Sequence, residues 1–382
     1  MRSFNILLTC SSNKTHILDW IKNSAEKLRS NSRIFAGDSN KNVSSKYFCD
    51  QFWHMPKCKS ENFNKILNYC KKNKIKIIIP SSDKELVFWS KFKTKFEKEK
   101  IFVMVSETQT IEVCLDKLSF YKKLKKFGSV IFTTQNVNNF KNTDILIAKR
   151  RVGSGSKKNK AGLKKNFLNN KKFIYQKFIK SNNEVSIDCF FSKNFDLLKV
   201  VPRLRTRVEN GESSITTVFE SKLIYQEIRK IGSMLNFSGH VMFQGFFDNN
   251  KIRIFECNPR IGGASVTSFY NNMDSIYLFI LENIFKKKID KLDKKVSPKS
   301  KIFICKKWFS NSLKTDFLPY KKVFFEKNNG NKKKLDFHFR TNCSEKVGMG
   351  HISRTLKLAN KFKKKGHNCY FYFDRLKNIQ NL

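Results

Sequence analysis

The 382-residue sequence lacks several features that would place it in a common class of protein. Its ten cysteines are scattered singly, with no C-x-x-C pair and no disulfide-like spacing, which favours reduced thiols in a cytoplasm. No apolar run approaches the roughly 18 to 20 residues of a membrane helix, and the apolar stretch 4–9 is too short for the core of a signal peptide. We therefore expect a cytoplasmic protein with no membrane partner.

Acidic residues are also scarce, since 31 Asp and Glu stand against 77 Lys and Arg and give a net charge of +46. Such a balance is typical of proteins that bind nucleic acid. The lysines are spread over the whole chain, however, as AT-rich coding produces, and no motif of basic residues with stacking aromatics is present. We expect no nucleic acid partner, and a basic nucleic-acid-binding protein is kept as an alternative.

Residues 1–107 alternate short apolar segments with amphipathic segments of helical length. Strands are expected at 4–10, 33–38, 75–80 and 101–106, and helices at 15–28, at 61–73 and from residue 82. This alternation predicts a doubly wound parallel sheet, a Rossmann-like α/β domain. The turn after the first strand, CSSNKTH, has no glycine, so the fingerprint of a dinucleotide site is absent.

Residues 108–310 predict an α+β domain that is rich in strands. We expect helices at 111–128, 221–236 and 272–287, and strands at 144–151, 173–179, 184–191, 197–206, 240–248, 251–260 and 301–309. The strands at 240–248 and 251–260 form a hairpin turned by DNN. Residues 311–334 lack periodicity and are interpreted as a linker. After it, residues 335–382 are expected to form a second series of elements, in the order strand, loop, helix and strand.

The segment IFECNPRIGGAS at 254–265 ends an apolar strand with polar residues. Glu256, Asn258 and Arg260 alternate along the chain and therefore share one face of an extended strand. Gln244 lies on the preceding strand of the hairpin, within reach of the same spot. A carboxylate with two amide oxygens suits a hard cation such as Mg²⁺, although the bare pattern also fits an ordinary strand end.

A second group of residues predicts a site for phosphates. Lys149 ends an apolar strand directly before Gly153, Ser154, Gly155 and Ser156, a loop whose N–H groups can form an anion-binding nest. The strand YQKFI at 175–179 offers a main-chain edge to adenine, and Glu184 offers a carboxylate to ribose. Taken singly, each of these also fits a flexible turn or a buried strand.

The ordered set of motifs resembles the ATP-grasp superfamily, closest to the carbamoyl-phosphate-synthetase-like carboxylate-amine ligases. It consists of DK at 116–117, AKRRVGSGS at 148–156, YQKFI at 175–179 with Glu184, PRLR at 202–205, HVMFQ at 240–244 and FECNPRIGGAS at 255–265. The resemblance covers about 1–310 and includes the acid-bearing PSSDKEL at 80–86. It implies a Rossmann-like preATP-grasp domain over 1–107 and an ATP-grasp α+β domain over 108–310. The chain departs from the family in having AKRR for Lys-Pro and lysines for some loop glycines.

The resemblance also implies ATP and Mg²⁺ or Mn²⁺ as cofactors, and a small-molecule carboxylate and an amine as substrates joined through an acyl phosphate. The nucleotide would be contacted by Lys117, Lys149, Gly153, Ser154, Gly155, Ser156, Gln176, Lys177, Phe178 and Glu184. The metal would be held by Gln244, Glu256 and Asn258. Arg260, Arg203 and Arg205 would face the transferred phosphate or the acidic substrate.

The C-terminal stretch FRTNCSEKVGMGHISRTLKLANKFKKKGH at 339–367 resembles the start of the nucleotide-sugar hydrolase of the pseudaminic acid pathway. In that resemblance His351 matches the catalytic histidine. Because the match stops after a few elements, we expect a truncated, inactive, partial Rossmann-like fragment over 335–382. By analogy it links the ligase to surface-glycan or nonulosonic acid biosynthesis, and a hydrolase acting through this portion is kept as an alternative.

Overall fold

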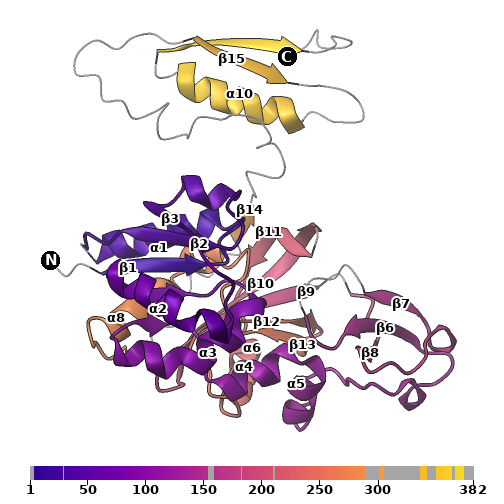
Figure 1. Ribbon diagram of the computed structural model, residues 1–382. Coiled ribbons are helices and arrows are strands. Elements are labelled where there is room, and N and C mark those ends of the chain that lie inside the picture. The colour runs from indigo at the N-terminus through magenta and orange to yellow at the C-terminus, as the bar shows by residue number, and fades with distance from the viewer. Residues whose placement is uncertain are drawn as a thin grey trace. The chain divides into compact units, whose positions relative to one another are not determined.

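The structure is a computed structural model that describes residues 4–28, 30–153, 159–181, 183–209, 211–289, 301–304, 336–341, 350–363 and 366–373. Its internal contacts divide the chain into two compact units, 1–317 and 318–382. Figure 1 shows the chain and labels most of its helices and strands. The linker predicted at 311–334 lies outside the described residues.

The N-terminal part of the first unit is a five-stranded parallel sheet in the order β3-β2-β1-β4-β5, of which β1, β2 and β3 are labelled in Figure 1. Its strands are β1 (Asn5–Thr9), β2 (Ile34–Asp38), β3 (Gln51–His54), β4 (Ile75–Ile79) and β5 (Phe102–Val103). Its helices are α1 (Thr15–Lys27), α2 (Phe63–Lys72) and α3 (Asp83–Lys98). The predicted Rossmann-like parallel sheet is confirmed, because the continuous apolar runs become central strands that are buried on both faces.

Helix α3 begins at the carboxyl edge of this sheet and is fixed there by a buried acid. Glu85 Oε1 accepts hydrogen bonds from the backbone N–H groups of Ser81 (2.9 Å) and Ser82 (3.2 Å). These contacts satisfy N–H groups that precede or begin the helix and set the direction in which it starts. Asp83, the first residue of α3, is thereby held at the edge where ligands bind in open α/β sheets.

The single helix predicted at 111–128 is wrong, because the chain forms two helices, α4 (Thr108–Leu115) and α5 (Lys117–Leu124). Asp116 separates them with extended backbone angles (φ −105°, ψ 104°) and caps α5 by accepting from the N–H groups of Leu118 and Ser119. An N-cap aspartate stabilises a helix start by about 1 kcal/mol, which favours the break at this position.

A three-stranded antiparallel sheet in the order β7-β6-β8 forms a separate lobe, at the right of the first unit in Figure 1. Its strands are β6 (Ile145–Arg150), β7 (Lys160–Leu163) and β8 (Phe173–Lys177). Leu146, Ala148 and Tyr175 belong to its own small core. Strand β7 was not predicted, because three of its four residues are exposed and the stretch KAGL contains a glycine, which is depleted in strands.

The largest sheet has six antiparallel strands in the order β13-β12-β9-β10-β11-β14. They are β9 (Glu184–Phe191), β10 (Leu197–Glu209), β11 (Glu212–Val218), β12 (Gly239–Asp248), β13 (Lys251–Asn258) and β14 (Lys301–Ile304). Helix α6 (Lys222–Gly232) buries Ile224, Ile228 and Ile231 in the core of this sheet. Two short helices, α7 (Val266–Phe269) and α8 (Ser275–Asn283), follow β13.

The hairpin predicted at 240–260 is confirmed. Asp248 pairs with Lys251, and the two residues between them, Asn249 and Asn250, have φ values of 49° and 56°. Positive φ at both central positions is the geometry of a type I′ turn, which asparagine tolerates and which matches the twist of the strands. The tight turn fixes the register in which the residues of β12 pair with those of β13.

The second unit contains β15 (Asp336–Thr341), α10 (Gly350–Lys363) and β16 (Asn368–Phe373), with the two strands parallel. The ring of Phe337 stacks on that of Phe362 with centroids 4.0 Å apart, which joins the sheet to the helix. The predicted order of strand, helix and strand is observed. The loop before α10 and the side chain of His351 lie outside the described residues.

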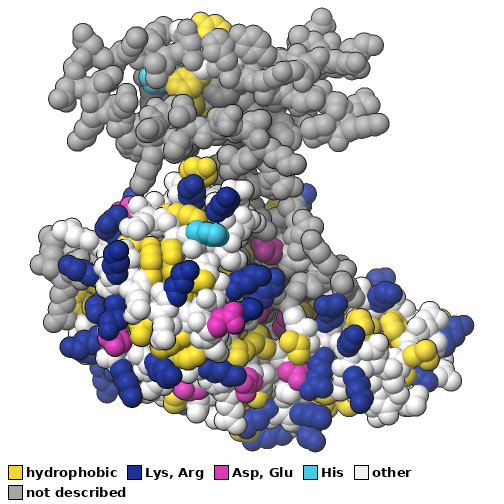
Figure 2. Space-filling model, in the orientation of Figure 1, with side chains coloured by type: hydrophobic (Ala, Val, Ile, Leu, Met, Phe, Trp, Pro, Cys, Tyr) yellow, Lys and Arg dark blue, Asp and Glu magenta, His cyan; other side chains and the backbone are white. Residues whose placement is uncertain are grey.

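Among the described residues, no helix is long and apolar enough to cross a membrane. Figure 2 shows the Lys and Arg side chains spread over the visible face rather than gathered in one patch. This distribution agrees with the dispersed charge expected from the sequence.

Candidate active site

The three predicted metal ligands share one face of the β12–β13 hairpin. Gln244 pairs directly with Glu256, and Asn258 follows two residues later, opposite Met242. The register shifts between Gln244 and Gly245, which leaves Phe255 as the extra residue of a β-bulge. A bulge bends a strand and redirects its side chains, and such bulges are frequent beside active sites.

The donor set at this position fits a hard cation. Gln244, Glu256 and Asn258 supply one carboxylate and two amide oxygens, and Mg²⁺ prefers oxygen ligands together with water and phosphate. The described residues contain no group of three or more His, Cys, Asp or Glu that could hold a metal alone. A cation bound here would therefore depend on additional oxygens from a bound ligand, and the assignment stays a prediction.

Two lysines lie beside Glu256. Lys117 Nζ is 3.4 Å from Glu256 Oε1 and donates a 2.8 Å hydrogen bond to the carbonyl oxygen of Gly153. Lys149 Nζ lies 4.0 Å from the ring centroid of Phe255. Burial lowers the pKa of Lys149 to about 8, nearby Lys117 adds to the decrease, and Glu256 opposes it. Two buried cations close to one carboxylate form a site suited to an anion with several charges, such as a polyphosphate.

A bidentate ion pair anchors the start of the predicted phosphate loop. Arg151 Nε lies 2.9 Å from both carboxylate oxygens of Asp116, and Nη2 lies 2.6 Å from Oδ2. Although burial opposes ionisation, hydrogen bonds from Arg151 and Ser119 hold the pKa of Asp116 below its ordinary value. The pair joins the end of β6 to the start of the helix that carries Lys117. Of the loop itself, Gly153 is described, whereas Ser154, Gly155 and Ser156 lie outside the described residues.

The residues predicted to contact the base lie on or just after β8. Gln176 is buried and its side-chain amide donates a hydrogen bond to Thr133 Oγ1 at 2.8 Å, so this side chain makes a contact within the protein interior. Lys177 is mostly exposed, with Nζ 3.0 Å from Asp144. The N–H of Phe178 donates to the carbonyl oxygen of Ile145 at 2.8 Å. The structure thus places the side chains of Gln176 and Lys177 in structural contacts, while the side chain of Phe178 is exposed, and the adenine contact stays a prediction about the main chain.

Glu184, the predicted ribose ligand, begins β9 beside Arg205. The Arg205 Nε atom lies 3.4 Å from Glu184 Oε1, and Nη2 donates a 2.9 Å hydrogen bond to the carbonyl oxygen of Gly211. Burial lowers the pKa of Arg205, and the charge of Glu184 opposes that decrease. Glu184 is a third exposed, so its carboxylate is accessible to a ligand.

Arg203 is 1% exposed and lies against a fully buried acid. Its Nε donates to Asp188 Oδ2 at 2.8 Å, and Asp188 also accepts from Ser265 (2.6 Å) and Ser268 (2.8 Å). Although burial opposes ionisation, Arg203 and the neighbouring His240 hold the pKa of Asp188 far below its ordinary value. One edge of Arg203 is therefore occupied by a structural ion pair.

The other edge of Arg203 carries a buried donor that lacks a partner. Within the described residues, Nη1 of Arg203, Nε of Arg205 and Oγ of Ser186 make no hydrogen bond. Ser186 is the cross-strand neighbour of Arg203, so these atoms lie close together. Because buried polar groups are almost always satisfied, this concentration points to a polar ligand at the same place.

Arg203 and two of the predicted metal ligands lie in one row of the sheet. Glu256, Gln244, Ser186 and Arg203 are successive cross-strand neighbours on β13, β12, β9 and β10. Adjacent strands are about 4.8 Å apart, so the row extends about 14 Å from Glu256 to Arg203. That length is suited to a nucleotide tail at one end and a small acid at the other.

Arg260 connects the row to the N-terminal sheet. Its Nε and Nη2 atoms donate to the two carboxylate oxygens of Asp83 at 2.7 and 3.0 Å. Although burial opposes the charge, Asp83 raises the pKa of Arg260. The acid-bearing segment at 80–86 was noted in the sequence, but its partner across the fold could not be read from it.

Glu212 was missed by the sequence analysis. It begins β11, and its charge acts on both Arg205 and Arg260. A Cβ atom at Gly263 would lie 2.9 Å from Oε2 of Glu212. The only signal in the sequence was the stretch ENGESS at 209–214, because the polar and small residues of β11 do not alternate clearly.

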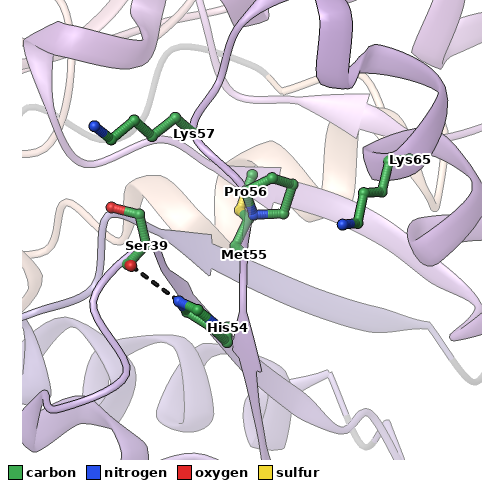
Figure 3. Close-up of a pocket in the computed structure, with 6 residues that line it drawn as sticks. All are labelled: Ser39, His54, Met55, Pro56, Lys57 and Lys65. Atoms are coloured by element: carbon green, nitrogen blue, oxygen red, sulfur yellow. Dashed lines mark hydrogen bonds between the residues drawn. The ribbon is translucent and has the colours of Figure 1, made fainter.

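A cavity of about 280 Å³ lies elsewhere, at the ends of β2 and β3. Figure 3 shows its lining residues, which are Ser39, His54, Met55, Pro56, Lys57 and Lys65. His54 Nε2 lies 3.0 Å from the carbonyl oxygen of Ser39. None of the predicted site residues lines this cavity, so it is a separate feature.

Two family models match the chain. Residues 6–104 match the PylC-like N-terminal domain, and residues 170–302 match a domain described as ATP-grasp in the biosynthetic pathway with Ter operon. No curated protein matches the chain.

Solved structures share the fold at low sequence identity. N5-carboxyaminoimidazole synthetase from Staphylococcus aureus complexed with ADP is 17% identical, with 76% of this chain and 80% of that chain covered and a TM-score of 0.56. A biotin carboxylase complex from Campylobacter jejuni is 13% identical, with coverage of 75% and 72% and a TM-score of 0.59. L-amino acid ligase from Bacillus licheniformis is 14% identical, with coverage of 78% for each chain and a TM-score of 0.55. The chain therefore shares the fold of these solved structures, and it matches a PylC-like N-terminal domain followed by an ATP-grasp domain.

Proposed function

We propose that the protein is an ATP- and Mg²⁺-dependent carboxylate-amine ligase that forms an amide through an acyl phosphate. The observation that carries this proposal is the placement of Lys117 and Lys149 beside Glu256, on the face that also presents Gln244 and Asn258. The fold shared with a synthetase that was solved with ADP supports it. Mg²⁺, or Mn²⁺ in its place, would be held by Gln244, Glu256 and Asn258 and would neutralise charge on the phosphates.

The lysines hold the phosphate chain in this proposal. Lys117 is fixed by the carbonyl oxygen of Gly153 at the start of the predicted phosphate loop, and Lys149 is fixed by burial against Phe255. Both are positioned before a ligand arrives, so little reorganisation is needed when negative charge develops. Glu184 accepts the ribose hydroxyls, and the main chain near Lys177 and Phe178 meets adenine.

The acid substrate occupies the unsatisfied donors of the row. Arg203 Nη1 and Ser186 Oγ receive its carboxylate and later the acyl phosphate, beside Arg205, whose Nε forms an ion pair with Glu184. A carboxylate oxygen attacks the γ-phosphorus of ATP, the bond to the bridging oxygen breaks, and ADP leaves. The nitrogen of a neutral amine then attacks the acyl carbon, the C–N bond forms, the C–O bond to phosphate breaks, and one N–H proton leaves with hydrogen phosphate. Arg260, held by Asp83, stabilises the transferred phosphate.

The decisive experiment is ADP release measured against a panel of amino acids and sugar acids with ammonia or an amine present. We expect at least one acid to stimulate release and Glu256→Ala to reduce it by a factor of about 100 or more. Glu227→Ala, which removes a partly exposed carboxylate on α6 paired with Lys230, is the matched control and should retain activity. Equal background release by wild type and Glu256→Ala with every acid would contradict the proposal.

The sugar acids in the panel test the proposed link to surface-glycan or nonulosonic acid biosynthesis. Its support is the resemblance of residues 339–367 to a nucleotide-sugar hydrolase, together with the parallel strand-helix-strand order of the second unit. Hydrolysis of a sugar nucleotide without ATP would favour the alternative in which this portion is the active part.

A further inference from the structure

The carboxylate of Asp188 is fully buried on β9, and four side chains surround it. Its Oδ2 accepts hydrogen bonds from Arg203 Nε (2.8 Å) and Ser268 Oγ (2.8 Å). Its Oδ1 accepts from Ser265 Oγ (2.6 Å) and lies 3.3 Å from His240 Nε2. Three of the four contacts do not involve the arginine, so groups other than Arg203 set the direction of this carboxylate.

The side chains that hold Asp188 are themselves fixed by the fold. Ser265 is the N-cap residue of α7, and its Oγ also accepts a 2.9 Å hydrogen bond from the backbone N–H of Gly262. On the other side, His240 Nδ1 lies 2.8 Å from Oγ of Ser275, the first residue of α8. The carboxylate is therefore joined to the starts of two helices, which makes it a rigid partner for Arg203.

Two of the three nitrogen atoms of the Arg203 guanidinium group are held in place. Nε donates to Asp188, and Nη2 donates to Sδ of Met242 at 3.3 Å. A Cβ atom at Gly262 would lie 2.6 Å from that sulfur, so Met242 is packed tightly against the loop after β13. Because the guanidinium group is planar, fixing Nε and Nη2 also fixes the direction of Nη1.

The remaining nitrogen, Nη1, is the one that the proposed function gives to the acid substrate. Within the described residues it has no hydrogen-bond partner, although Arg203 is only 1% exposed. A buried donor without a partner lowers stability, and a buried ion pair adds little stability in return for its desolvation. Stability alone therefore does not account for this pair, whereas a ligand that binds Nη1 does.

We infer that Asp188 is a positioning residue, which directs Arg203 so that Nη1 meets the carboxylate of the acid substrate. The inference rests on the proposed ligase function. Asp188 does not touch the substrate in this arrangement, because the four surrounding side chains occupy both of its oxygens. It acts through Arg203, whose Nη1 and the neighbouring hydroxyl of Ser186 bind the acid.

The test measures KM for the acid and KM for ATP separately, with the acid that releases most ADP in the panel. Asp188→Asn should raise KM for the acid by about tenfold to a hundredfold, as displacement of a binding group does, and leave KM for ATP unchanged. A double-mutant cycle with Arg203→Gln identifies the route of the effect. The double variant should lose no more kcat/KM for the acid than Arg203→Gln alone, because Asp188 then has no arginine to direct.

A further variant keeps the test independent of the folding of Asp188→Asn, which leaves the charge of Arg203 buried without its partner. Ser268→Ala removes one hydrogen bond to the oxygen that Arg203 Nε uses and keeps the ion pair. It should raise KM for the acid severalfold at an unchanged KM for ATP. Ser90→Ala, which removes a buried serine of α3 that donates to the carbonyl oxygen of Val87, is the matched control and should change neither value.

Three results would overturn the inference. They are an unchanged KM for the acid in Asp188→Asn or Ser268→Ala, equal rises in KM for the acid and for ATP, and losses that multiply in the cycle with Arg203→Gln. Absence of ADP release by wild type with every acid would instead overturn the proposed function, so the two failures are distinguishable.

Discussion

Arg260 and Asp83, 177 residues apart in the chain, form a two-point ion pair across the fold, with N–O distances of 2.7 and 3.0 Å. Asp83 is the first residue of α3 in the PylC-like domain, and Arg260 follows β13 in the ATP-grasp domain. Both side chains are largely buried, with exposed fractions of 13% for Arg260 and 9% for Asp83. The pair thus fixes a proposed catalytic arginine through the neighbouring domain.

Asp83→Asn should lower both stability and activity. Removing one partner of a buried ion pair leaves the other charge uncompensated, which costs about 3 kcal/mol or more. Urea unfolding followed by circular dichroism measures this loss, and ADP release measures the effect on Arg260. Asp19→Asn, an exposed change on α1, is the control. Wild-type stability in Asp83→Asn would show that the pair adds nothing to the fold.

The lowered pKa of Lys149 leads to a prediction of how the stability of the protein depends on pH. The amine titrates near 8 in the folded protein because it is buried, compared with an ordinary value of 10.5. Between these values the unfolded chain binds more protons at this site than the folded chain does, so the contribution of Lys149 to stability rises with pH. Relative to Lys149→Met, the free energy of unfolding of wild type should increase by up to about 3 kcal/mol between pH 8 and pH 10.5.

The same titration predicts that the affinity for nucleotide changes with pH in the direction opposite to the change in stability. Phosphate favours the charged lysine, so the affinity of wild type for ADP with Mg²⁺ should fall as pH rises through about 8. Calorimetry at several pH values measures it, with Lys149→Met expected to show a flatter profile. Parallel profiles of the two proteins would mean that Lys149 does not contact phosphate.

Much of the fold could be predicted because local pattern and burial agree. The apolar runs of β1 and β4 predicted a buried parallel sheet, and DNN predicted the turn that aligns Gln244 with Glu256. Strands β3, β7 and β11 were missed because they are short, or polar and partly exposed. The break at Asp116 was missed because the helical pattern continues through it, and the ion pair of Asp116 with Arg151 joins segments that are distant in sequence.

Site residues could be predicted where a motif is continuous in sequence, as in the 254–265 segment. The pairings of Asp83 with Arg260 and of Asp188 with Arg203 could not, because the strand order of the sheets decides which distant residues meet. Charge type is readable from sequence, whereas the partner of each charge is set by topology.

Arg151→Gln should weaken nucleotide binding without breaking helix α5. Asp116 keeps its backbone contacts to Leu118 and Ser119 in this variant, so the cap remains while the tie to the end of β6 is lost. We expect a severalfold rise in KM for ATP and little change in KM for the acid, because the phosphate loop begins directly after this residue. Arg253→Gln, which removes a partly exposed pair with Asp248, is the matched control. An unchanged KM for ATP would show that the ion pair of Arg151 with Asp116 does not hold the phosphate loop in place for nucleotide binding.

Gln244→Glu should strengthen metal binding. The side chain lies directly opposite Glu256, so the substitution places a second carboxylate on the same face of the hairpin. Divalent cations gain affinity with each added carboxylate, provided the two acids share the ion rather than repel each other. Titration with Mn²⁺, followed by its paramagnetic relaxation, should show at least a severalfold lower Kd without nucleotide. Gln176→Glu changes a buried glutamine of the lobe instead and should not tighten the metal. Weaker Mn²⁺ binding in Gln244→Glu would mean that the two acids face each other without an ion between them, and the metal would then have to lie elsewhere on the row.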